Sequence, residues 1–85
     1  MTYVVTIHNG DNTGDMAYDQ APAQAGVLEG DASREQMEAM ARELIVAALD
    51  GMLSEEEMTN MDAIVDGCLK NEDEAFFRWY TTKVG

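Results

Sequence analysis

Several residue types that carry chemistry are nearly absent from this chain of 85 residues. It has one cysteine, Cys68, which excludes an internal disulfide, and one histidine, His8, which excludes a pair of imidazoles on one metal ion. No apolar segment approaches the roughly 20 residues that a membrane-spanning helix needs. The N-terminus lacks the basic and apolar regions of a signal peptide. We therefore expect a cytoplasmic protein with no membrane contact, no metal and no cofactor.

Basic residues are also scarce. Five lysines and arginines stand against 17 acids, which gives a formal net charge of −12. Direct nucleic-acid binding is disfavoured, because phosphate contacts need the lysines and arginines that this chain lacks. Self-repulsion of this size costs stability, so a fold that keeps it invites a functional explanation. The composition predicts a basic protein as the partner.

Catalytic motifs are missing as well. The chain has no P-loop, no dinucleotide glycine fingerprint and no Cys/His metal spacing. Ser33 and Ser54 are predicted to cap helices, and Cys68 falls on an apolar helical face, where we expect a core residue. His8 is expected to be a solvated residue at the end of a strand. A carboxylate pair needs a pocket that holds its members in different environments, and a chain this short has little room for one. We expect neither catalytic residues nor an enzyme.

The middle of the chain predicts a helical hairpin within a single domain, residues 1–85. Helices are expected over 33–50 and 54–70, each started by a serine in a capping box, Ser33 and Ser54. Gly51 is suited to the left-handed conformation that closes the first helix. Apolar residues recur with helical spacing in both segments. The residues expected in the core are Leu44, Ile45, Leu49, Met61, Val65 and Leu69.

Both ends of the chain predict strands. Residues 2–8 read TYVVTIH, which is rich in β-branched residues and is followed by an Asn-Gly turn. Residues 75–83 are rich in aromatic residues and threonine, although a third helix beginning near Asn71 is a competing interpretation. Residues 9–32 are irregular, with short strands conceivable at Asp15–Gln20 and Ala25–Glu29. The fold prediction is α+β: a small antiparallel sheet of the N- and C-terminal strands, packed against the helical hairpin.

The segment ending at Asp50 reads GVLEGDASREQMEAMARELIVAALD. In its Gly30-Asp31 turn before a capped helix, it resembles the HicB antitoxin family over residues 2–50. The aspartate-proline-glycine turn of that family is absent here, since residues 19–22 read Asp-Gln-Ala-Pro. The resemblance implies a β-rich start that leads into a packed helix.

Acidic residues are concentrated in the second predicted helix. Residues 54–74 hold eight acids, and Lys70 is the only base among them. Glu55, Asp62 and Asp66 are spaced i, i+7 and i+11, which places them in one row on a continuous helix. Carboxylates in such a row can stand where the phosphates of a nucleic acid would stand. The alternative is that the acids only favour the helix N-terminus and solubility.

The aromatic tail is predicted to supply the anchor that charge alone cannot. With strand alternation, Phe77, Trp79 and Thr81 share one face, while Phe76 and Tyr80 lie on the other. One face is expected in the core and the other exposed. The predicted partner-binding residues are Glu55, Glu56, Asp62, Asp66, Asp73, Phe76, Trp79 and Tyr80.

These features predict a small acidic inhibitor that neutralises a basic, nucleic-acid-handling protein, with nucleic-acid mimicry as one way of doing so. In size, charge and lack of catalytic apparatus the chain resembles phage-encoded inhibitors, including the anti-CRISPR proteins, and acidic antitoxins. The alternatives are an antitoxin-like neutraliser of a basic toxin and an acidic adaptor that self-associates through its methionine-rich helical face, a homodimer being one form of it.

Overall fold

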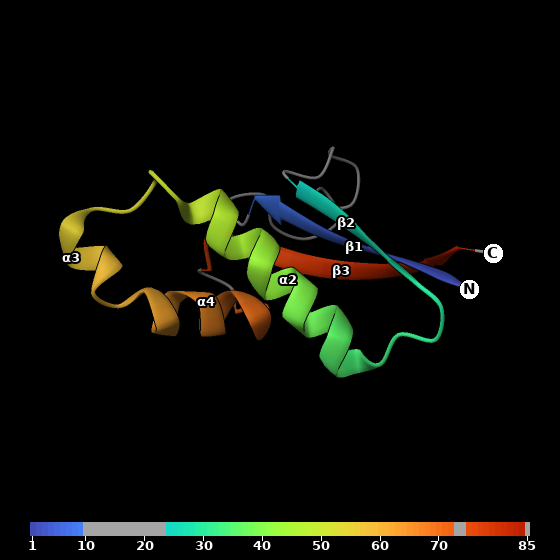
Figure 1. Ribbon diagram of the computed structural model, residues 1–85. Helices are drawn as coiled ribbons and strands as arrows, with labels where there is room; N and C mark the ends of the chain where they lie inside the picture. The colour runs from blue at the N-terminus through green and yellow to red at the C-terminus, as the bar shows by residue number, and fades with distance from the viewer. Residues whose placement is uncertain (10–23, 73–74, 85) are drawn as a thin grey trace.

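The computed structural model describes residues 1–9, 24–72 and 75–84. Its sheet consists of three antiparallel strands, β1 (Thr2–Asn9), β2 (Gln24–Glu29) and β3 (Phe77–Val84), in the order β2-β1-β3. The first strand is therefore the central one, and it pairs with the last strand along its whole length. This pairing brings the two ends of the chain together (Figure 1).

The predicted α+β fold is thus confirmed, including the sheet built from both ends of the chain. The conceivable strand around Val27 is confirmed as β2, whereas the one at Asp15–Gln20 lies outside the described residues. The competing third helix near Asn71 is wrong, because Asn71 follows the end of a helix and precedes β3. Residues of the β1 segment are mostly β-branched, and such side chains suit a strand that is hydrogen-bonded on both edges.

The first helix, α2 (Arg34–Leu49), begins and ends as local sequence signals predict. The Ser33 hydroxyl accepts a hydrogen bond from the Gln36 N–H (3.2 Å), and the Ser33 N–H donates one to the Gln36 side chain (2.7 Å). Gly51 has φ 82°, the left-handed conformation that glycine adopts without steric cost. Figure 1 shows α2 lying across one face of the sheet.

The second predicted helix is wrong as a continuous element over 54–70. The structure has α3 (Glu55–Met58) and α4 (Met61–Leu69), separated by Thr59 and Asn60. The Thr59 hydroxyl donates a hydrogen bond to the Glu56 carbonyl (2.6 Å), and Asn60 leaves the helical region with φ −110° and ψ 20°. Threonine and asparagine favour such local bonds over helix continuation, which explains the break. The second capping box, between Ser54 and Glu57, is present.

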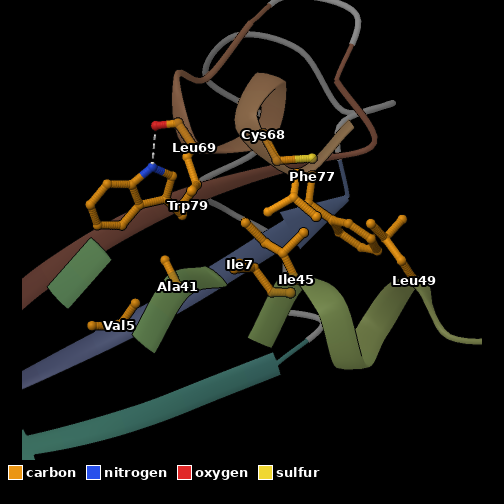
Figure 2. Packing of buried hydrophobic residues seen from close by; sticks show 10 residues of the cluster. Val5, Ile7, Ala41, Ile45, Leu49, Cys68, Leu69, Phe77 and Trp79 are labelled. Atoms are coloured by element: carbon orange, nitrogen blue, oxygen red, sulfur yellow. Dashed lines mark hydrogen bonds between the residues drawn. The ribbon is translucent and has the colours of Figure 1, made fainter. Parts of the chain in front are cut away.

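The core lies between the sheet and the two longer helices (Figure 2). Alternate residues of β1 and β3 point into it, and one apolar stripe of α2 and of α4 covers them. Of the six predicted core residues, Leu44 and Met61 are only half-buried and pack against the core from its border. The buried residues are Val5, Ile7, Ala41, Ile45, Leu49, Val65, Cys68, Leu69, Phe77 and Trp79.

Asn71, in the connection between α4 and β3, is bonded to both elements. Asn71 has φ 53°, and its N–H donates to the Cys68 carbonyl (3.0 Å) while the Glu72 N–H donates to the Gly67 carbonyl (3.1 Å). These two bonds form a Schellman motif, with asparagine in the left-handed position. The Asn71 side chain then pairs with the backbone of Trp79, accepting from its N–H (2.9 Å) and donating to its carbonyl (3.2 Å). This pairing occupies part of the outer edge of β3.

None of the helices in the described part of the chain combines the length and the apolar character that crossing a bilayer requires.

Candidate partner-binding surface

The acidic side chains lie almost entirely at the surface. Among the described residues twelve are acidic, and all are exposed except Glu57, which is half-buried and engaged in the Ser54 capping box. Several of the bases make contacts within the protein. The Arg34 guanidinium carbon lies 4.5 Å from the centroid of the Trp79 ring, and Arg42 is paired with an acid on α4. The exposed surface of the described residues is therefore strongly negative.

The predicted acidic row is divided between two helices. Glu55 and Glu56 lie in the first turn of α3, whereas Asp62 lies in the first turn of α4 and Asp66 one turn further along. All four are exposed. Because the helix breaks between α3 and α4, these carboxylates do not form the single straight row that a continuous helix would give. Asp73 lies outside the described residues.

Asp66 already has a partner within the chain. Its Oδ1 accepts a hydrogen bond from Arg42 Nη2 of α2 at 2.8 Å, and about half of each side chain remains exposed. An exposed ion pair contributes at most about 1 kcal/mol to stability. The pair also leaves less negative charge at Asp66 for an external base. Asp66 is thus a weaker candidate for partner contact than Glu55, Glu56 and Asp62.

The predicted aromatic anchors separate into three different environments. Trp79 is wrong as an exposed anchor: it is 3% exposed, and its indole N–H donates to the Leu69 carbonyl at 2.7 Å, as the dashed line in Figure 2 marks. Phe76 is 37% exposed and borders a shallow depression beside α4. Tyr80 is half-buried, with its ring 5.2 Å from that of His8 in an edge-to-face arrangement. Phe76 is the most accessible of these aromatic side chains.

His8 is not the solvated residue that the sequence predicts. It is 8% exposed, and its Nε2 lies 3.2 Å from the Thr6 hydroxyl. Alternation along β1 places it on the opposite side from Val5 and Ile7, beside the Tyr80 ring. The Tyr80 ring on the neighbouring strand accounts for part of this burial. The residues next to His8 in the sequence do not predict that contact.

Sequence reasoning missed an apolar groove at the corner between α2 and α3. The groove has a volume of about 220 Å³ and is open to solvent. It is lined by Val46 and Leu49 of α2, Leu53 of the connection, and Met58 and Met61. We call this feature the corner groove. The usable signal was Thr59-Asn60, which ends α3 after four residues and leaves Met58 on a helix too short to bury an apolar face.

The segment that lines the corner groove carries ionisable residues of one sign only. Residues 43–62, which include its lining, contain six acids and no base. One of them, Asp50, lines the groove itself. The apolar residues Val46, Met52 and Met58 are exposed here. Exposed apolar side chains bordered by polar residues are typical of protein–protein contact sites.

The arrangement offers little for covalent or metal chemistry. Within the described ranges no group of three or more His, Cys, Asp or Glu side chains is placed to hold a metal ion. Cys68 is fully buried, as predicted, and this burial raises the pKa of its thiol above the ordinary value. A buried, protonated thiol is a poor nucleophile.

No protein-family model, curated protein or solved structure matches this chain. The resemblance to the HicB antitoxins therefore rests on the Gly30-Asp31 turn and the capped helix alone.

Proposed function

We propose that this protein is a small acidic inhibitor that acts in the cytoplasm, binds a basic nucleic-acid-handling protein and competes with nucleic acid for it. The observation that carries the proposal is the one-sided charge of residues 43–62, with six acids and no base. Five of these six acids are exposed. Four of them lie on α2, α3 and α4, and the fifth, Asp50, directly follows α2. The same segment exposes the apolar side chains of Val46, Met52 and Met58.

The physical basis is charge complementarity with a site built for phosphates. A protein that binds nucleic acid gathers lysines and arginines into a positive surface, and much of its affinity comes from neutralising them. A patch of fixed carboxylates is attracted to the same surface and raises the association rate by about 10- to 1,000-fold. This attraction acts over a patch and needs no straight row of acids, so the break between α3 and α4 does not weaken the proposal.

Proteins of the host cell that bind heparin, a polyanion, are passed over the immobilised protein, and those that it retains are identified. Each retained protein is then titrated with duplex DNA and with RNA. We expect nucleic acid to displace it, and we expect its affinity for the inhibitor to fall steeply between low and high salt.

Two charge-reversal variants give the matched comparison. Glu56→Lys with Asp62→Lys alters the acidic corner, while Glu29→Lys with Asp31→Lys alters exposed acids at the other end of α2. Both change the net charge equally, and both spare Asp66, whose reversal would place a lysine against Arg42. We expect only the first variant to associate more slowly with the target. Equal loss in the two variants would show that overall charge, not this surface, governs binding, and no loss in either would refute the proposal.

A second candidate is self-association, which the exposed Met52 and Met58 favour. The charge of −12 on each copy opposes it. Sedimentation at increasing salt separates the two: screening would promote a dimer, but would weaken binding to a basic target. An antitoxin-like role uses the same surface and differs only in the target, which the retained proteins identify.

A further inference from the structure

The corner groove has the size and lining of a socket for one side chain. A cavity of about 150 Å³ accommodates benzene, and the corner groove measures about 220 Å³. Its walls are the apolar side chains of Val46, Leu49, Leu53, Met58 and Met61. The side chain of a leucine, methionine or phenylalanine would be removed from water when it binds there. This burial supplies affinity that surface charge does not.

We propose that the corner groove binds an apolar anchor side chain carried on a basic segment of the partner, such as an amphipathic helix with lysines and arginines around the anchor. This inference rests on the proposed function and assigns it a contact site. The charge of the surroundings selects the occupant: every ionisable residue within 43–62 is acidic, and Asp50 lies in the groove wall. A basic residue next to the anchor would therefore be attracted by this segment, which has no lysine or arginine to repel it.

The same charge disfavours a second copy of this chain as the occupant. Two copies that joined through the corner groove would each bring Asp50 of the groove wall to the contact, together with the acids of α3, the four-residue helix that carries Met58. Like charges placed opposite each other at an interface weaken binding, so this surface disfavours a second copy and favours basic partners.

The groove is also able to adapt to its occupant. Met58 is 58% exposed and belongs to α3, a helix with no buried residue. Methionine has an unbranched, polarisable side chain that fills irregular gaps, and it is frequent in surfaces that accept more than one apolar anchor. The two methionines of the lining, Met58 and Met61, can therefore close around anchors of different shape.

The direct test uses three synthetic helical peptides of equal length. The first carries leucines along one face and lysines elsewhere, the second replaces the leucines with serine, and the third keeps the leucines and replaces the lysines with glutamate. Binding is followed by NMR of the methionine methyl groups. We expect only the leucine–lysine peptide to shift Met58 and Met61, while Met37 and Met40, which pack against the core elsewhere, stay unchanged. Absence of a shift at Met58 and Met61 with that peptide would overturn the inference.

Variants with equal exposure provide the control. Met58→Ser alters the corner groove, and Val27→Ser alters β2; the two side chains are 58% and 55% exposed, so neither change should unfold the protein. We expect Met58→Ser to weaken the leucine–lysine peptide about tenfold, the usual scale for losing an anchor contact, and Val27→Ser to leave it unchanged. Equal affinity of both variants would overturn the inference.

The two proposals fail in different ways. If the serine–lysine peptide binds as tightly as the leucine–lysine peptide, the inference about the corner groove falls while the acidic inhibitor stands. If the leucine–glutamate peptide binds equally well, the groove is a general apolar site, and the assignment of a basic segment is refuted. If self-association of the protein shifts Met58 and Met61 at high concentration, a second copy is the occupant and the inference is likewise refuted.

Discussion

Asn71 offers the most informative test of how this fold is held together. It takes the left-handed position that ends α4, and its side chain pairs with both the N–H and the carbonyl of Trp79 on β3. One residue thus fixes the direction of the chain as it leaves the helix and the place of the strand that follows. Replacing it by glycine keeps the first property and removes the second, whereas replacing it by alanine disturbs both.

The structure allows the size of each effect to be worked out. Asn71→Gly loses two hydrogen bonds worth about 0.5–1.5 kcal/mol each, or about 1–3 kcal/mol of stability. Asn71→Ala loses the same bonds and forces alanine into the left-handed region at about 1–2 kcal/mol. Alanine restricts the unfolded chain more than glycine does, and this stabilises the alanine variant by about 0.4–1 kcal/mol relative to the glycine variant. We therefore expect the alanine variant to be less stable than the glycine variant, by up to about 1.5 kcal/mol.

Urea denaturation measures these differences, since the one tryptophan of the chain, Trp79, is 3% exposed and reports unfolding by its fluorescence. With a slope of about 1–3 kcal/mol per molar urea, a loss of 2 kcal/mol shifts the midpoint by roughly 1 M. Circular dichroism serves as the second probe, because Asn71 contacts Trp79 directly. A glycine variant as stable as the native protein would refute the contribution of the side-chain bonds. An alanine variant more stable than the glycine variant would refute the left-handed conformation.

Three further predictions follow from the core and the surface. Leu49→Ala should lower the free energy of unfolding by about 2–5 kcal/mol in the same denaturation assay, because Leu49 is fully buried; an unchanged midpoint would place it at the surface. Burial raises the pKa of the Cys68 thiol above its ordinary value of 9.0. The unfolded chain therefore releases this proton at a lower pH than the folded protein does, and stability falls as the pH rises through and above 9.0. Cys68→Ala should show a smaller fall between pH 8 and 10, and equal slopes would contradict the reasoning. Asp66→Asn should change stability by less than about 1 kcal/mol, because its ion pair with Arg42 is half exposed, and a larger loss would mean that this pair orders α4 against α2.

Features decided within a few residues were predictable from the sequence. The capping boxes at Ser33 and Ser54 and the left-handed Gly51 are present because their partners lie within three or four positions along the chain. The break at Thr59 and Asn60 was missed although it is also local. Apolar residues continue at helical spacing through Met58 and Met61, and that periodicity outweighed the weak helix propensity of threonine and asparagine.

The candidate site was predicted less well, because its properties depend on residues far apart in the chain. Glu55, Glu56 and Asp62 are exposed as expected, but Asp66 is paired with Arg42, 24 positions away. The corner groove needs α2, the connection after it and Met61 together, so no single segment predicts it. Met58 was expected on the apolar face of the second helix, and the short α3 leaves it exposed instead.

By itself the sequence determined the charge of the protein, the starts of α2 and α3 and the strand character of both its ends. These follow from composition, from capping bonds between near neighbours and from side-chain shape at the backbone. Only the tertiary structure decided that Trp79 is buried beneath α4, that His8 lies against Tyr80, and that Asp50 lies in the wall of an open apolar groove. Burial is a property of what covers a side chain, and His8 and Tyr80 belong to strands that meet only when the ends of the chain pair.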